Sequence, residues 1–295
     1  MAGTLTHQIF ATSFLSKTNI KLDKDLFLLS SQGHDLLYFL NLTDMFKLDK
    51  ALDTSFILQE QNFDKLIINY TKLIIDNNNN NELKSFLYGY IIHHLLDSYT
   101  HPFIISLSGK FNKNDSLTFK YNGNHEKLES DIDMTLWKYF DLNKKIYKEF
   151  PKRLFISDTL FSVTEEVFYK TYNIKNIGAT LINNLNKVNH FLFLYRSDLL
   201  GIKEFCYKLL DSLTKISSTK YTFLSFSSSK KFDVFKKVTW TNPVTKEKCV
   251  SSFMDLFDES LKESLSLINK IDESIKLKEI PNYLKNISAI TGIKE

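Results

Sequence analysis

The sequence predicts an all-α protein, and three observations support this prediction. The 295 residues include only eight glycines and four prolines, too few for the many tight turns of an all-β fold. Long stretches repeat apolar residues at the three- and four-residue spacing of helices. Apolar residues make up 43% of the chain, which is enough to bury a substantial core between helices.

The N-terminal part of the chain is expected to form helices separated by polar turns. A first helix is expected over residues 5–17, with His7 in its first turns. The segment Leu22–Leu29 leads into the turn Gly33-His34-Asp35. Apolar spacing predicts the next helix over residues 56–75, and the asparagine-rich run after it is expected to be a solvated loop.

The helix expected over residues 82–99 carries the first functional pattern. His93 and Asp97 are four residues apart and therefore lie on one helical face. Gly89 permits a close neighbour on this helix. His101 comes directly before a proline, and such a residue is disfavoured in the α region. We therefore expect His101 just past the helix end, with its imidazole folded back over the same face.

A second helix repeats this spacing. His125 and Glu129 are four residues apart in a helix expected to run to about Phe150, and Asp133 follows one turn later on the same face. Imidazole and carboxylate are the ligands of zinc enzymes, and a carboxylate shared between ions allows more than one metal. Because structural zinc sites favour cysteine and the chain has only two, the sequence predicts a catalytic metal site between two facing helices.

A single pair of this kind has a simpler explanation, because a histidine on an apolar helix more often pairs with a carboxylate inside the core. The chain has seven histidines, and those at 93, 94, 101 and 125 fall within this short span. Two pairs at the same spacing therefore favour metal binding. His94 points about 100° away from His93 around the helix axis, so a packed or hydrogen-bonded structural role is favoured for it.

The second half of the sequence has helical patterns but no further chemical motif. The Ser-, Thr- and Lys-rich connection at residues 215–248 suits a solvated loop, or else contact with a membrane surface through aromatic and lysine side chains. We expect one helical domain over residues 1–295, with the metal site in residues 1–150 and a helical C-terminal half, residues 151–295. Helices of that half are expected over residues 158–173, 177–199, 202–216, 251–270 and 279–287.

These motifs resemble those of the bacterial zinc-dependent phospholipase C family. The segment Phe86–Pro102 resembles the central metal helix of that family, and the His125/Glu129 pair resembles its next metal helix. Thr6–Ala11 is similar to the opening helix, which carries a ligand histidine. Ser31–Asp35 is similar to the Gly-Pro-Asp turn, and Asp233–Ile268 is similar to the tail of bacterial members. The resemblance therefore spans nearly the whole chain.

The resemblance implies an all-helical bundle with up to three zinc ions in a cleft between helices. Asp35 would be either a metal ligand or the general base. We expect two zinc ions and leave a third open, because family members with three metals use a further histidine, and none occurs at residues 36–92. His34 is an alternative ligand there. The ligands implied for this sequence are His93, Asp97, His101, His125 and Glu129, followed by His7 and Asp35.

The charge, the arginine content and the apolar segments of the sequence limit the binding partners and the cellular location that we expect. The net charge of +4 is modest, and Arg153 and Arg196 are the only arginines, whereas specific nucleic-acid readers rely on arginine. No segment reaches the roughly 18 apolar residues of a membrane span. No secretory signal pattern opens the sequence. We therefore expect a cytoplasmic protein that is not a specific nucleic-acid reader and whose membrane contact is at most peripheral and transient.

The leading hypothesis is a zinc-dependent phosphodiesterase that hydrolyses a glycerophospholipid to diacylglycerol and a phosphorylated head group. One alternative is a nucleic-acid or nucleotide phosphodiesterase like the zinc nucleases, which are similar in fold and ligands. The other is a non-enzymatic protein in which metal binding only holds the helices together. Head-group preference and oligomeric state are left open.

Overall fold

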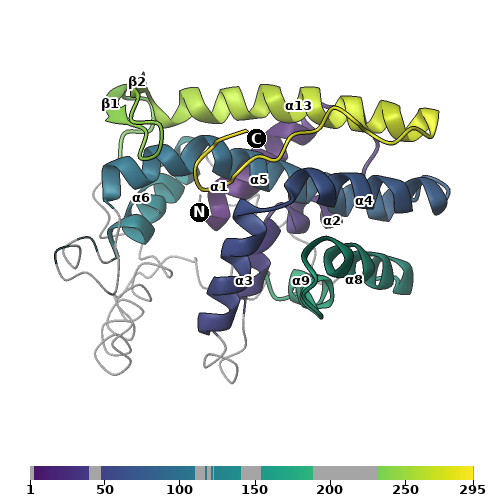
Figure 1. Ribbon diagram of the computed structural model, residues 1–295. Helices are drawn as coiled ribbons and strands as arrows, with labels where there is room; N and C mark the ends of the chain where they lie inside the picture. Colours follow the sequence, from purple (N-terminus) through teal and green to yellow (C-terminus); the bar gives the residue numbers. More distant parts are fainter. Residues whose placement is uncertain are drawn as a thin grey trace.

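The structure is a computed structural model that describes residues 3–39, 48–109, 117, 121, 123–140, 154–188 and 232–294. Within these residues the protein is mostly helical, with a single two-stranded sheet (Figure 1), which confirms the all-α fold class. The elements in chain order are α1 (Thr4–Leu15), α2 (Lys24–Ser30), the 3-10 helix η1 (Gly33–Tyr38), α3 (Leu48–Glu60), α4 (Phe63–Asp76), α5 (Asn81–Ser108), α6 (Asn124–Tyr139), α8 (Asp158–Tyr172), α9 (Ile177–Leu185), β1 (Val238–Thr241), β2 (Lys248–Ser251) and α13 (Phe253–Leu277).

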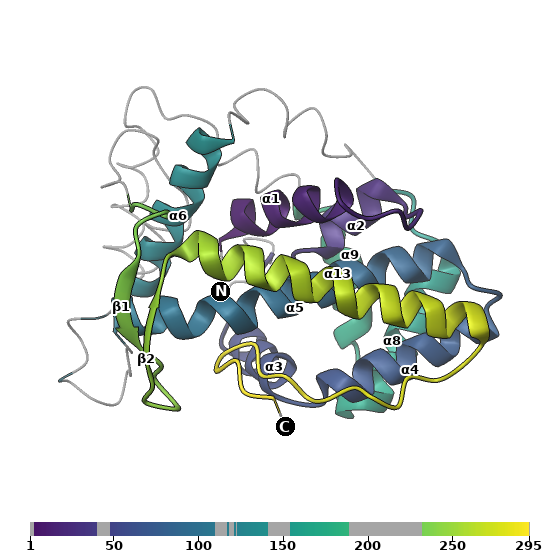
Figure 2. The same ribbon diagram turned by 90° about the horizontal axis from the view of Figure 1, so that it is seen from above.

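Helix α5 lies at the centre of the fold and is buried along most of its length. Seen from above, α13 lies along α5, with α1 and α2 on one side and α4 on the other (Figure 2). Helix α2 comes closest to α5 at Gly89, where a Cβ atom would lie 2.0 Å from Ser30 Oγ and 2.7 Å from the Phe27 carbonyl oxygen. Only glycine allows this approach, as the sequence predicted.

Helix α13 is fixed to α5 by a buried carboxylate. Asp272 accepts a hydrogen bond from the Tyr88 hydroxyl at 3.2 Å and lies 3.5 Å from Lys84 Nζ, both on α5. The helix begins with a capping box in which Ser252 and Asp255 each bond to the backbone N–H of the other. The contacts of Asp272 with Tyr88 and Lys84 hold α13 against α5, the helix that carries most of the candidate ligands. None of the described helices is long and apolar enough to span a membrane.

The helix boundary predicted at Pro102 is wrong. Helix α5 continues through His101 and Pro102 to Ser108. Proline has no N–H to donate to the Ser98 carbonyl four residues earlier. Proline and the residue before it are therefore disfavoured within a helix, but this is only a local conformational preference. Tight packing on all sides of α5 outweighs that preference here. His101 therefore projects from the helix itself and shares a face with Asp97.

Other helix predictions also need correction. The helix expected over residues 56–75 is two helices, because Asn62 adopts a left-handed φ of 57° between α3 and α4. No helix forms over residues 279–286, and this segment instead runs along the outside of the bundle (Figure 2). Helix α6 ends at Tyr139 and α9 at Leu185. The remainders of these two predicted helices at 141–150 and 189–199, together with residues 202–216, lie outside the described residues.

A β-hairpin occurs where the sequence predicted a loop. Strands β1 and β2 pair antiparallel, with Trp240 opposite Cys249. The Trp240 ring packs edge-on against Phe103 of α5, with ring centroids 5.7 Å apart, and so attaches the hairpin to the central helix. The earlier part of this connection, residues 215–231, lies outside the described residues.

Candidate metal centre

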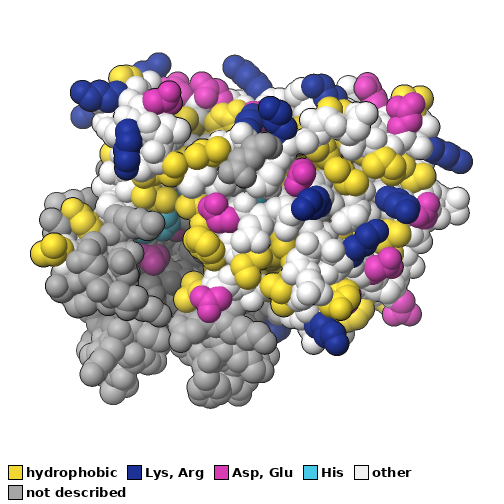
Figure 3. Space-filling view, in the orientation of Figure 1, with side chains coloured by type: hydrophobic (Ala, Val, Ile, Leu, Met, Phe, Trp, Pro, Cys, Tyr) yellow, Lys and Arg dark blue, Asp and Glu magenta, His cyan; other side chains and the backbone are white. Residues whose placement is uncertain are grey.

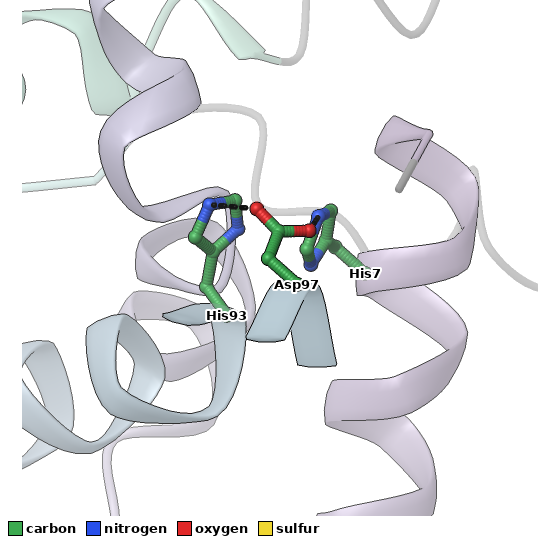
Figure 4. A group of neighbouring side chains, drawn as sticks. All are labelled: His7, His93 and Asp97. Atoms are coloured by element: carbon green, nitrogen blue, oxygen red, sulfur yellow. Dashed lines mark ion pairs between the residues drawn. The ribbon is translucent and has the colours of Figure 1, made fainter. Parts of the chain in front are cut away.

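The carboxylate of Asp97 lies among imidazoles from three segments of the chain. Figure 4 shows His7 of α1 and His93 of α5 on its two sides. His7 Nε2 is 3.3 Å from Asp97 Oδ1, and His93 Nε2 is 3.4 Å from Oδ2. His34 of η1 places its Nε2 3.5 Å from Oδ2, and His101 Nε2 is 4.0 Å from Oδ1. Asp97 is therefore the side chain around which the candidate ligands gather.

The first turn of η1 brings Asp35 to the same place. Asp35 Oδ1 is 3.4 Å from His34 Nε2, and ligand atoms of His34, Asp35 and His93 lie within 4.8 Å of one another. Gly33 has a φ of +49°, and a Cβ atom there would lie 2.1 Å from the His93 ring. Only glycine lets the turn approach this closely. The Gly-His-Asp turn thus delivers two side chains to the cluster.

A further group lies at the more open end of the site. His125 Nε2 is 2.8 Å from Glu129 Oε1 on α6, and ligand atoms of these two residues and of His101 lie within 4.8 Å of one another. The His125 side chain is 29% exposed, whereas that of Asp97 is fully buried. Figure 3 shows a histidine and an acidic side chain inside a depression on one face of the molecule. A ligand would therefore reach the centre from the His125 side.

The donor set and its spacing fit zinc. Two ligands about 2.0–2.1 Å from a tetrahedral zinc ion are roughly 3.3 Å apart. The nitrogen-to-oxygen distances around Asp97 that involve His7, His93 and His34 are 3.3, 3.4 and 3.5 Å, which is long for hydrogen bonds. Within the described residues, the buried Nε2 of His101 has no hydrogen-bond partner. Buried polar atoms are ordinarily satisfied, so this arrangement suits a bound cation.

Backbone carbonyls determine which ring nitrogen faces the cluster. Nδ1 of His93 is 3.0 Å from the Ser31 carbonyl oxygen, and Nδ1 of His101 is 2.8 Å from the Ala289 carbonyl oxygen. Because a carbonyl can only accept, both rings carry their proton on Nδ1 and present the Nε2 lone pair to the Asp97 side. Metal-binding histidines take this arrangement, in which the second nitrogen donates to an outer partner.

Asp133, which the sequence placed on the ligand face of the second helix, lies outside the ligand groups. Its carboxylate accepts hydrogen bonds from the backbone N–H groups of Leu5 and Thr6 at 3.2 and 2.8 Å and from the Thr6 hydroxyl at 2.6 Å. The first N–H groups of a helix lack partners within the helix, so Asp133 caps α1 from α6. A Cβ atom at Gly3 would lie 2.2 Å from this carboxylate. The cap holds the turn that carries His7.

Burial controls protonation within the site. It lowers the pKa of His34, His93 and His101 well below the ordinary value, so these imidazoles are neutral near pH 7. Burial also raises the pKa of Glu129 to about 8 and, together with the Asp97 charge, raises the pKa of Asp35. Neutral imidazole is the form that binds metals, so the histidines need lose no proton to do so.

The structure brings together the side chains that the sequence predicted as ligands and adds one. His34, left open in the sequence, joins the Asp97 cluster; its position next to Asp35 in the glycine turn was the available signal. His94 lies outside the groups, as expected: its Nε2 donates to the Ile287 carbonyl at 2.6 Å, and its ring stacks on Phe63 at 3.7 Å. The three groups of potential ligands are His7, His93 and Asp97; His34, Asp35 and His93; and His101, His125 and Glu129.

Comparison with known proteins decides the family. A family model described as zinc dependent phospholipase C matches residues 4–197, about two thirds of the chain. The chain belongs to the zinc-dependent phospholipase C family. No curated protein and no solved structure matches it.

Membership of the zinc-dependent phospholipase C family confirms the resemblance found in the sequence and identifies zinc as the cofactor. The three groups of potential ligands in the described residues are sufficient for two or three zinc ions. The family match includes every candidate ligand from His7 to Glu129. The hairpin, α13 and the segment after it lie beyond the matched residues.

Proposed function

We propose that this member of the zinc-dependent phospholipase C family hydrolyses a glycerophospholipid at the phosphate ester on the glycerol side. Water would add to phosphorus, and the products would be diacylglycerol and a phosphorylated head group. The observation that carries the proposal is a buried carboxylate, Asp97, among four imidazoles, next to a group that opens to the surface at His125.

The ligand assignment is part of this proposal. His7, His93, Asp97 and the His34/Asp35 turn would hold zinc at the buried end, and His101, His125 and Glu129 would hold it at the open end. Bound zinc would make a water molecule acidic near neutral pH and would stabilise negative charge on the phosphoryl oxygens.

The protein side chains would supply orientation and proton transfer. Asp35 is largely buried, and burial together with the Asp97 charge raises its pKa, so it holds a proton more readily than an exposed aspartate. Asp35 would act either as one of the zinc ligands or, if it binds no zinc, as the general base that accepts a proton from the attacking water. The substrate phosphate would approach from the more exposed His125 side.

The test uses purified zinc-loaded protein and vesicles of phosphatidylcholine, phosphatidylethanolamine or phosphatidylglycerol. We expect diacylglycerol release from at least one of them and none from the Asp97→Asn variant. Single-stranded DNA and a nucleotide diester serve as competing substrates. Cleavage of these without release of diacylglycerol would refute the phospholipase proposal in favour of the nuclease alternative. Zinc binding without turnover of any diester would favour the non-enzymatic alternative.

A further inference from the structure

Residues 286–293, here called the C-terminal strap, lie against the side of α5 that carries His101. We propose that this strap is a positioning element of the zinc site, in which the Ala289 carbonyl fixes the ring of His101. The inference rests on the proposed function only through the role of His101 as a zinc ligand. It assigns a role in the centre to a segment outside the residues that match the family.

The strap is attached to the end of α3. The Asn286 side-chain amide donates to the Glu60 carbonyl at 3.2 Å, and the Ser288 hydroxyl donates to the Glu60 carboxylate at 2.8 Å. The Ala289 N–H donates to the Gln59 carbonyl at 2.8 Å. These bonds join segments more than 200 positions apart in the sequence and fix Ala289 from its N–H side. Its carbonyl therefore has a defined direction.

The strap also has its own internal structure. The Ser288 hydroxyl oxygen accepts from the N–H groups of Ile290 and Thr291 at 3.2 and 2.9 Å. The Gly292 N–H donates to the Ser288 carbonyl at 2.9 Å, and the Ser288 N–H donates to the Ile293 carbonyl at 3.0 Å. A turn closed by four hydrogen bonds is more rigid than a plain extended tail, as a positioning element requires.

The strap contacts α5 at the point where Pro102 interrupts the helical hydrogen bonds. Pro102 has no N–H to donate to the Ser98 carbonyl. Gly292 lies over that carbonyl: a Cβ atom there would be 2.5 Å from Ser98 O and 3.6 Å from Pro102 Cγ, and its φ is +70°. On the same face, Nδ1 of His101 donates to Ala289 O at 2.8 Å. Glycine is therefore required for the strap to come close enough to bind His101.

Loss of the strap contact would affect one part of the centre. Without the Ala289 carbonyl, the His101 ring is free to rotate and to move its proton to Nε2, the nitrogen that faces Asp97. Removal of such an outer partner typically weakens metal binding about 10–100-fold. His93 would keep its own acceptor, the Ser31 carbonyl. We therefore expect weaker zinc binding at the His101–His125–Glu129 group and unchanged binding at the buried group.

The test compares two glycine substitutions. In Gly292→Ala the added methyl group would meet the Ser98 carbonyl at 2.5 Å, and in Gly178→Ala it would meet the Thr164 carbonyl, between α9 and α8, at the same 2.5 Å. Zinc affinity is measured by competition with chelators of graded strength. We expect one class of zinc to bind about 10–100-fold more weakly in Gly292→Ala, and wild-type affinities in Gly178→Ala even if both variants melt earlier.

A milder variant, Ser288→Ala, removes only the hydroxyl that closes the strap and keeps the inference testable if Gly292→Ala does not fold. In Ser288→Ala, the affinity of the same class of zinc should fall by a smaller factor than in Gly292→Ala. In zinc-loaded protein labelled with ¹⁵N-histidine, the wild-type His101 ring should carry its proton on Nδ1, and the signal should broaden or shift in both strap variants.

Wild-type zinc affinities in both strap variants would overturn the inference, as would equal losses in Gly292→Ala and Gly178→Ala. All of these measurements concern zinc and not diester turnover, so a protein that binds zinc as expected but cleaves no phospholipid would refute the proposed function alone. A wild-type protein that bound no zinc would refute both.

Discussion

Replacement of Asp133 by alanine should weaken both the fold and the zinc site, although Asp133 belongs to none of the three groups of potential ligands in the described residues. The substitution removes three hydrogen bonds, of 2.6, 2.8 and 3.2 Å, from the start of α1. Burial raises the pKa of Asp133 to about 6, so the group is mostly charged at neutral pH. A hydrogen bond to a charged group contributes about 1.5–3 kcal/mol, and loss of a helix cap costs about 0.5–2 kcal/mol.

Because the three bonds share one carboxylate, whose own desolvation offsets part of their gain, we expect a loss of about 3 kcal/mol in all. For a chain of this length that corresponds to a melting temperature lower by roughly 6 °C. Asp133→Asn keeps an acceptor oxygen and should lose about half as much. The first turn of α1, which carries His7, would no longer be held by the cap. The zinc affinity of the Asp97 cluster should therefore fall about tenfold in Asp133→Ala.

Thermal melts and chelator competition measure the two effects. Ser157→Ala is the matched control, because the Ser157 hydroxyl caps α8 by accepting from the Leu160 N–H at 3.0 Å. Because the same hydroxyl also donates to the Glu82 carboxylate, Ser157→Ala should lower stability by about 1–3 kcal/mol and leave zinc affinity unchanged. If Asp133→Ala melted like the wild type, or lost stability while keeping full zinc affinity, the idea that this cap positions His7 would be refuted.

Two other predictions concern the same centre, and a third concerns the contact between α13 and α5. Asp97→Asn and Glu129→Gln should each lose zinc and most diesterase activity while circular dichroism shows unchanged helix content, because each removes an anionic ligand at nearly constant shape; full turnover in either would contradict the assignment. Chelation should lower the melting temperature and added zinc should restore it, since zinc at 1,000 times its dissociation constant stabilises by about 4 kcal/mol. Asp272→Asn should cost about 2 kcal/mol by weakening the bonds from Tyr88 and Lys84, and its zinc content by elemental analysis should equal that of the wild type.

The candidate ligands on α5 and α6 were predictable because their geometry is local. A four-residue step places two side chains on one face of any helix, so His93/Asp97 and His125/Glu129 could be paired without knowledge of the fold. His101 shows the limit of this reasoning. The structure places His101 next to Asp97, as the sequence predicted. The predicted helix end before Pro102 was wrong, because tertiary packing outweighs the preference of a pre-proline residue and the helix continues to Ser108.

The groups that orient the ligands were not predictable in the same way. Asp133 caps a helix that lies 127 or more positions earlier in the chain, and no local pattern specifies such a partner. The acceptors for His93 and His101 are the carbonyls of Ser31 and Ala289, and a main-chain carbonyl leaves no trace in side-chain identity. The sequence does show where the backbone must come very close to another group near these contacts. Glycine occupies those positions, which are 3, 33 and 292.

The same three glycines indicate how the centre is assembled. Each lies where a segment remote in sequence approaches a ligand or its support: Gly3 at the Asp133 cap, Gly33 at the His93 ring and Gly292 on the helix turn that carries His101. Each segment also supplies or receives a hydrogen bond there. A buried site with neutral imidazoles gains little from charge pairing before metal arrives. Its side chains must therefore be held by packing and backbone hydrogen bonds, and substitution at these contacts should lower zinc affinity without changing a single ligand.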